Sequence, residues 1–394
     1  MKIGIGLSTE KDPTQAAQEA TREALKNMHA ENISLAVLFS SIEFANSEAS
    51  KTISSLLGSV PIVGSSSLGI ISNKGIFKHG LAIMLLSLPQ DIYFNTGCVK
   101  EISAKSATTA GEELGERLIY GFKNIRRDLG VIFSDGLMRD GSGFLYGLQE
   151  RLGTSFPLTG GSASDNLAFK KTYLYFNNEA FSDAACGILL GGKLNFGLGI
   201  KHGWKALGKP RYVTKSAGNT VYEIDGMAAV TIYKDYFACE LAKLRKELKL
   251  ISILYPIGIY LAGEDEYLLR NLVSIEDNGA LVFQSNIPQG SPIRLMIGTK
   301  ESCLAATRQA LEEMKQGLSG RKINFLFVFD SVSRYILLGR QAHQELEIIK
   351  EEVGQDIPII GIYTYGEQAP LKSINYQGRP YFHNQTISVL GIGG

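Results

Sequence analysis

Residues 156–166 read FPLTGGSASDN: an apolar residue, a proline, two residues, a glycine and then small hydroxyl residues. The same pattern occurs in VPIVGSSSLG (residues 60–69) and in IPIIGIYTYG (residues 357–366). Proline fixes φ and lacks a hydrogen-bond donor, so it suits the entry of a short or edge strand. One such turn says little, but three copies indicate an internal repeat that governs the interpretation of the whole chain.

The segments that flank the three turns correspond as well. Before each turn lies a buried-strand run with a polar end, and its last phenylalanine precedes the proline by 22, 24 and 29 residues. These gaps suit one helix each, and the helical patterns end at glycine, a frequent C-cap residue. A further strand and helix precede each run, and a two-strand pattern follows each turn. The three runs are LAVLFSS (35–41), LGVIFSD (129–135) and FLFVFDS (325–331).

One unit of strand, helix, strand, helix, short strand and hairpin therefore recurs three times. Strands that alternate with helices predict parallel pairing, and the hairpins should add antiparallel strands. We therefore expect an α/β fold, a two-domain sandwich of mixed sheets. The expected domains are residues 1–202, with units 1–90 and 91–202, and residues 203–394, with the third unit at 292–394.

The region between the second and third units has a different character. It carries short alternating strands and the turn signal EDNG (276–279), which indicates an insertion of antiparallel strands. The run IRLMIGTK (293–300) is then expected to open the third unit. Trp204, the single tryptophan, either packs at the interface or forms a wall of a ligand cleft.

Composition excludes several classes of function. The 394 residues carry a net charge of +1, and no dense basic cluster favours nucleic acid or an anionic membrane. The four cysteines are far apart and the five histidines lack metal-ligand spacing, so no metal is expected. Neither GxGxxG after a strand nor a P-loop motif occurs, so no cofactor is expected.

The sequence also predicts a soluble protein. The N-terminus lacks the apolar stretch of a signal peptide. The most apolar segment, Leu250–Gly263, is interrupted by Pro256 and is shorter than the roughly 18–20 residues of a membrane helix. We expect a cytoplasmic protein without membrane insertion.

The repeat places polar residues at one edge of the sheets. Ligands of open α/β sheets bind at the carboxyl ends of the strands. The polar residues that end the three strand runs, and the three turns, should meet at this edge. Helix N-capping is the alternative role for Ser40, Ser41 and Ser134.

The third unit is chemically the richest, because Arg334 and Glu367 could receive the carboxylate and ammonium groups of a free amino acid. The alternatives are a solvated Arg334–Glu367 surface pair and two unrelated charges.

A serine-dependent reaction is a second possibility. Ser162 and Ser164 lie in a glycine-rich turn but not in a GxSxG elbow, and a serine nucleophile needs a histidine partner. His383 could serve only if the last hairpin of the third unit faced the turn of the second. We therefore do not expect an enzyme, and we keep a Ser-dependent hydrolase or acyl transferase, or a ligand-free scaffold, as alternatives.

Several segments resemble the FIST domain family (F-box and intracellular signal transduction). Residues 61–71 and 157–165 resemble its N-terminal half. Its C-terminal half is resembled by residues 203–237, 329–341, 358–370 and 381–393. The most specific pieces are Gly218–Gly226, Tyr363–Glu367 and His383–Asn384.

The resemblance implies FIST N-terminal and C-terminal domains and a sensory protein that binds a small ligand, with an amino acid or related small acid suggested. No fused signalling module follows in this sequence, so a separate partner such as a histidine kinase or chemoreceptor is expected to read the signal by a conformational change. The candidate ligand-binding residues are Gly161, Ser162, Ser164, Asp165, Asp330, Ser331, Arg334, Tyr363, Thr364, Tyr365, Glu367, His383 and Asn384.

Overall fold

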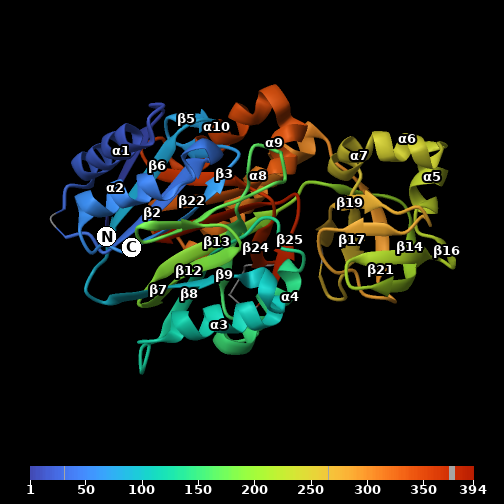
Figure 1. The fold of residues 1–394 in the computed structure, drawn as a ribbon, viewed down its shortest axis with the longest axis horizontal. Helices are drawn as coiled ribbons and strands as arrows, with labels where there is room; N and C mark the ends of the chain where they lie inside the picture. Colours follow the sequence, from blue (N-terminus) through green and yellow to red (C-terminus); the bar gives the residue numbers. More distant parts are fainter. Residues whose placement is uncertain (31, 265, 372–377) are drawn as a thin grey trace.

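A computed structural model describes residues 1–30, 32–264, 266–371 and 378–394. Figure 1 shows a large body of sheets and helices on the left and a smaller lobe, the inserted domain, on the right. The inserted domain comprises residues 205–297, and the body comprises the remainder of the described chain. The expected mixed α/β fold with several mixed sheets is confirmed.

The body contains the three repeat units, each built around a parallel pair of strands. The first unit consists of β1 (Lys2–Ser8), α1 (Pro13–Met28), β2 (Leu35–Ser41), α2 (Ser47–Leu57), β3 (Ile62–Ser67), β4 (Ile70–Ser72), β5 (Gly75–Phe77) and β6 (Leu81–Ser87). The second consists of β7 (Ile92–Lys100), α3 (Ala107–Ile119), β8 (Arg127–Ser134), α4 (Gly141–Leu152), β9 (Leu158–Ser162), β10 (Leu174–Phe176), β11 (Glu179–Phe181) and β12 (Ala184–Gly192). The third consists of β13 (Asn195–Lys201), α8 (Lys300–Leu318), β22 (Ile323–Ser331), α9 (Val332–Leu338), α10 (Ala342–Val353), β23 (Ile359–Thr364), β24 (Glu367–Pro370), β25 (Pro380–His383) and β26 (Ile387–Gly393).

Short elements complete the described part of the chain. In this part, three 3-10 helices span Ile42–Phe44, Ile102–Ala104 and Gly339–Gln341. The inserted domain consists of β14 (Lys205–Ala217), β15 (Thr220–Ile224), β16 (Met227–Ala228), α5 (Thr231–Phe237), α6 (Leu241–Lys246), α7 (Leu248–Leu254), β17 (Ile257–Tyr260), β18 (Tyr267–Arg270), β19 (Leu272–Ile275), β20 (Leu281–Phe283) and β21 (Pro292–Ile297).

The proline and glycine of the repeated turn have the same role in each unit. The carbonyl oxygens of Pro61, Pro157 and Pro358 accept hydrogen bonds from the neighbouring central strand, each at 2.9 Å. A Cβ atom at Gly64 or Gly160 would lie 1.8 or 1.9 Å from a carbonyl oxygen of that strand. Only glycine permits this close approach of the two parallel strands.

The hairpins that follow the turns are exchanged between units. The β4–β5 hairpin of the first unit pairs with β23 of the third, and β10–β11 of the second pairs with β3 of the first. The β24–β25 hairpin of the third unit pairs with β9 of the second. Each unit thus completes the sheet of another unit, so the three units interlock.

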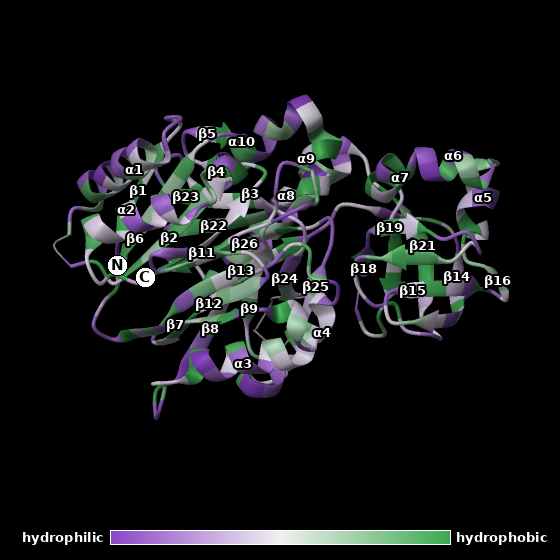
Figure 2. Cartoon of the chain, viewed as in Figure 1, coloured by the Kyte–Doolittle hydropathy of each residue, from purple (hydrophilic) through white to green (hydrophobic). Residues whose placement is uncertain are grey.

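The core lies between the three sheets. Alternate residues of β2, β8 and β22 point into one shared hydrophobic cluster, where Phe133 contacts Phe39 and Phe329 with ring centroids 5.6 and 6.1 Å apart. The other face of each sheet packs against its helices: α1 and α2, α3 and α4, or α8 and α10. In Figure 2 the strands of the body are mainly hydrophobic, whereas the helices present polar residues outward.

One sequence-based expectation about the third unit is wrong. Residues 293–300 do not supply its first strand, because β21 pairs with β14 and β17 of the inserted domain. The strand in that position is β13, which pairs with β26 along its whole length. The inserted domain therefore interrupts the third unit between its first strand and its first helix.

Candidate functional site

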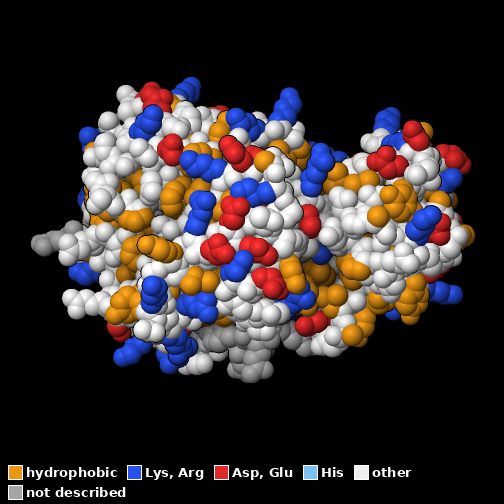
Figure 3. All heavy atoms as spheres, turned by 60° about the horizontal axis from the view of Figure 1, so that its bottom comes forward, with side chains coloured by type: hydrophobic (Ala, Val, Ile, Leu, Met, Phe, Trp, Pro, Cys, Tyr) orange, Lys and Arg blue, Asp and Glu red, His pale blue; other side chains and the backbone are white. Residues whose placement is uncertain are grey.

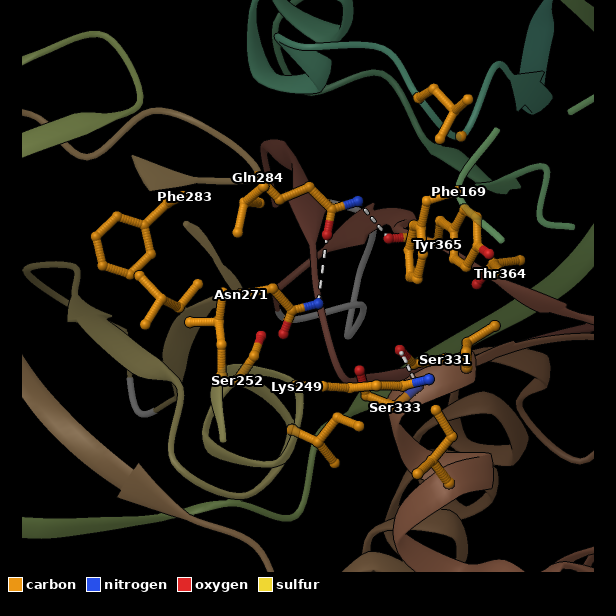
Figure 4. Close-up of a pocket in the computed structure, with 18 of the residues that line it drawn as sticks. Phe169, Lys249, Ser252, Asn271, Phe283, Gln284, Ser331, Ser333, Thr364 and Tyr365 are labelled. Atoms are coloured by element: carbon orange, nitrogen blue, oxygen red, sulfur yellow. Dashed lines mark hydrogen bonds between the residues drawn. The ribbon is translucent and has the colours of Figure 1, made fainter. Parts of the chain in front are cut away.

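A cavity of about 530 Å³ lies between the body and the inserted domain, and we call it the interdomain cavity. Figure 4 shows its residues converging from both parts of the molecule. The body contributes Gly136, Leu137, Met138, Arg139, Phe169, Ser331, Val332, Ser333, Ile336, Thr364 and Tyr365. The inserted domain contributes Asn219, Leu248, Lys249, Ser252, Ile253, Asn271, Leu272, Val273, Phe283 and Gln284.

Hydrogen bonds connect α7, which forms one wall of the cavity, to the body. The indole N–H of Trp204 donates a 3.0 Å hydrogen bond to the carbonyl oxygen of Ile253. The amide of Gln385, which precedes β26, donates to the carbonyl oxygens of Ser252 and Ile253. Trp204 is buried at the junction and does not line the cavity, so its emission should report the position of α7.

A second tie joins the inserted domain to the turn of the third unit. Gln284 donates from Nε2 to the carbonyl oxygen of Tyr365 at 2.6 Å, and its Oε1 accepts from the amides of Asn271 and Asn384. The amide oxygen of Asn384 in turn accepts from the backbone N–H of Asn271 at 3.3 Å. This polar network forms one end of the interdomain cavity.

The loop after Asp165 forms the aromatic wall. The Asp165 carboxylate accepts hydrogen bonds from the backbone N–H groups of residues 168–171 and from the Tyr365 hydroxyl. Burial opposes ionisation, but these donors lower the pKa of Asp165. The loop holds Phe169, which has a φ of 51°, against Tyr365 in a stacked pair with ring centroids 4.5 Å apart. Asp165 therefore positions the wall without lining the cavity.

Thr364 lines the interdomain cavity and contacts a buried carboxyl group. Its hydroxyl lies 2.5 Å from Oε1 of Glu367 and 3.2 Å from the carbonyl oxygen of Asp330. Burial raises the pKa of Glu367 to about 7, although hydrogen bonds from Thr364 and Thr386 oppose the shift. Because Thr364 has one hydroxyl hydrogen, a protonated Glu367 can donate to Thr364 while Thr364 donates to Asp330.

Gly161 allows the turns of the second and third units to meet next to Thr364. It pairs with Glu367 across β9 and β24. A Cβ atom at Gly161 would lie 2.4 Å from Cγ2 of Thr364. Any larger residue would therefore push the Thr364 side chain out of position.

Arg334 belongs to a buried ion cluster and does not line the cavity. It is fully buried and donates to Asp330, Glu345, Thr307 and the carbonyl oxygens of His202 and Cys303. The expected Arg334–Glu367 pair, whether as a ligand clamp or as a solvated surface pair, is absent among the described contacts. Each of the two side chains is satisfied by other internal groups.

The serine and histidine residues considered for catalysis are bonded elsewhere. His383 does lie close to the turn of the second unit, because β25 pairs with β24 and β24 pairs with β9. Its Nε2 nevertheless donates to the carbonyl oxygen of Ala369 at 2.9 Å, and burial lowers its pKa to about 3. The Ser162 hydroxyl bonds to Ser134, and the Ser164 hydroxyl donates to the carbonyl oxygen of Tyr363.

Ser40, Ser41 and Ser134 do not cap helices α2 and α4 with their side chains. Asn46 is the N-cap of α2, and Asp140 is the N-cap of α4. Ser331 caps α9 and lines the interdomain cavity at the same time.

Of the thirteen predicted residues, three line the cavity: Ser331, Thr364 and Tyr365. The others lie behind the wall or in the interlocked hairpins, and Tyr363 packs against Tyr335 in the third unit. The wall of the inserted domain was not predicted. Its only sequence signal is that Asn219 and Asn271 stand at polar breaks between apolar strand runs.

Surface charge, possible metal ligands and apolar helices bear on other classes of site. Figure 3 shows acidic and basic side chains interspersed over one face of the molecule. In the described ranges, no three His, Cys, Asp or Glu residues are placed to hold a metal ion. None of the helices that the structure describes is long and apolar enough to cross a membrane.

Comparison with known proteins identifies two domain families in the chain. The FIST N domain model matches residues 34–227, and the FIST C domain model matches residues 229–370. An uncharacterised protein of Methanocaldococcus jannaschii is 25% identical over 370 residues, which cover 84% of this chain and 67% of the relative. An uncharacterised protein of Mycobacterium tuberculosis is 24% identical over 391 residues, which cover 95% and 96% of the two chains.

Similarity to solved structures is weak. A structure of cyanuric acid hydrolase, described as an innovation by structural concatenation, aligns with 99% of each chain at 8% identity. Its TM-score is 0.37, a value at which the likeness supports no conclusion about activity.

Proposed function

The chain belongs to the FIST family, and from this premise we propose that it is a sensory protein whose small ligand occupies the interdomain cavity. FIST domains are in general small-ligand sensory domains of signalling proteins. The proposed ligand is an amino acid or a related small acid. A separate signalling protein would read the altered surface.

The observation that carries this proposal is that the walls of the cavity come from two parts of the molecule. A cavity of about 530 Å³ lies within the range of small-molecule sites, roughly 300–1,000 Å³. A ligand that contacts Lys249 and Phe283 on one side and Thr364 and Phe169 on the other binds best at one separation of these walls. Binding would then shift the population of body–inserted domain arrangements, which is the basis of a sensor.

A thermal-shift panel of amino acids and small organic acids tests whether the full chain binds any of them. A bound ligand raises the melting temperature by mass action. The same titrations followed by Trp204 emission test the conformational change, because the Trp204 indole bonds to α7. We expect a saturable change in both signals with at least one ligand. A flat response to the whole panel would refute the proposed function.

A further inference from the structure

The interdomain cavity is lined by positive charge but by no described acidic residue. Arg139, from the loop after β8, and Lys249, from α7, both line it. Both side chains are exposed, and within the described ranges neither forms a hydrogen bond or an ion pair. In Figure 4 the Lys249 side chain extends from α7 toward Ser331 and Ser333 on the opposite wall. Two cations without a partner among the described residues favour an anionic group in this cavity.

The buried carboxyl groups near the wall are occupied by protein donors. Oε1 of Glu367 shares a hydrogen bond with the Thr364 hydroxyl, and Oε2 accepts hydrogen bonds from Thr386. Both oxygens of Asp165 accept hydrogen bonds from the loop that follows it. An ammonium group in the cavity would therefore find hydroxyl and amide oxygens, which accept hydrogen bonds but do not balance its charge.

The remainder of the lining is mostly hydrocarbon. Apolar and aromatic side chains come from both walls, and the neutral polar ones are serine, threonine, asparagine and glutamine. Burial of an apolar ligand surface against such a lining contributes roughly 25 cal/mol per Å². The apolar contributors are Leu137, Met138, Phe169, Leu248, Ile253, Leu272, Val273, Phe283, Val332, Ile336 and Tyr365.

We infer that the ligand of the interdomain cavity is an organic anion with an apolar body and without an amino group. Arg139 and Lys249 receive its carboxylate, and the two aromatic walls around Phe169 and Phe283 receive its body. The inference rests on the proposed function and narrows it, because a zwitterionic amino acid of the same size would bring an ammonium group that the cavity does not neutralise.

Matched pairs of ligands test this distinction directly. Isothermal titration calorimetry on the full chain would compare phenylalanine, leucine and tryptophan with 3-phenylpropanoate, 4-methylpentanoate and indole-3-propanoate, which differ from them only by the amino group. We expect at least one of these acids to bind about tenfold or more tightly than its amino acid. The neutral 3-phenylpropanamide measures the contribution of the carboxylate.

Charge-removing variants locate the site. In R139Q/K249Q, we expect the affinity for the tightest acid to fall by about tenfold or more, while the affinity for the neutral amide stays within about twofold. Lys243→Gln is the matched control, because Lys243 is an exposed lysine of α6 outside the cavity lining. Its affinity for the acid should equal that of the unmodified chain.

The outcomes separate the two proposals. Tighter binding of the amino acid in every pair that binds overturns the anion inference and leaves the proposed function intact. Equal loss of acid and amide affinity in R139Q/K249Q, or an unchanged acid affinity, also overturns it. Binding of none of the seven compounds refutes this inference, and a flat response to the wider thermal-shift panel would refute the proposed function as well.

Discussion

The side-chain amide of Gln284 donates a 2.6 Å hydrogen bond to the backbone carbonyl oxygen of Tyr365. This bond connects the inserted domain to the turn that ends β23, at the edge of the interdomain cavity. The same glutamine accepts from Asn271 and Asn384, so one side chain links three segments. Its removal should loosen the cavity without disturbing either hydrophobic core.

We predict that Gln284→Ala weakens ligand binding and makes the position of α7 relative to the body less constrained. Gln284 is partly buried, and loss of its hydrogen bonds should cost about 0.5–1.5 kcal/mol locally. Trp204 emission should shift to longer wavelength in the ligand-free variant, because its contact with the Ile253 carbonyl becomes less constrained. Gln316→Ala, on an exposed helix surface, is the control. An unchanged emission spectrum would show that the Gln284 contact does not hold the domains.

Gly161→Ala should destabilise the protein by about 1–3 kcal/mol through overpacking. The new Cβ would lie 2.4 Å from Cγ2 of Thr364, and Thr364→Ser removes that methyl group. The double variant should therefore recover most of the loss in urea denaturation. If Thr364→Ser gives no recovery in the Gly161→Ala background, the clash is not the cause.

Arg334→Met should destabilise the fold by about 3–5 kcal/mol, because it leaves the buried carboxyl groups of Asp330 and Glu345 without their cation. Arg308→Met, at an exposed ion pair on α8, is the control and should cost less than about 1 kcal/mol. Equal urea midpoints for the two variants would contradict the structural role of Arg334.

Glu367 should make folding stability fall as pH rises from about 4.5 to about 7. Burial raises its pKa, so in this window the unfolded state ionises Glu367 while the folded state keeps the proton. Glu367→Gln removes this contribution to the pH dependence of the free energy of unfolding. The stability difference, variant minus unmodified chain, should therefore increase by about 3 kcal/mol across the window.

The comparison with the unmodified chain isolates Glu367 from other buried groups. His383 has its pKa lowered to about 3 by burial, so its contribution to stability is lost as pH falls below its ordinary value. That slope is common to both proteins and cancels in the difference. A constant difference between pH 4.5 and 7 would show that Glu367 titrates normally in the folded state.

Much of the repeat could be predicted from sequence because local geometry requires it. Gly64 and Gly160 are glycine because a carbonyl oxygen occupies the position of a Cβ atom. Alternating apolar residues predict a strand, but they do not specify its partner. For that reason the exchange of hairpins between units and the position of β13 were not predicted.

The lining of the candidate site was predicted only in part, for a related reason. Ser331 and Thr364 follow from their place at strand ends, where α/β proteins bind ligands. Arg334 and Glu367 are charged residues of the kind that contact ligands. The sequence does not reveal that Arg334 already bonds to Asp330 and that Glu367 already bonds to Thr386. Lys249 and Gln284 belong to an insertion whose docking onto the body depends on tertiary contacts.

Hydrogen–deuterium exchange of the full chain, with and without the tightest-binding compound of the matched pairs, tests the central claim most directly. The claim is that one ligand contacts both walls of the interdomain cavity. We predict slower exchange in residues 136–139 and 166–171 of the body and in 248–254 and 271–273 of the inserted domain. Protection confined to one wall, or to segments outside the cavity lining, would contradict it.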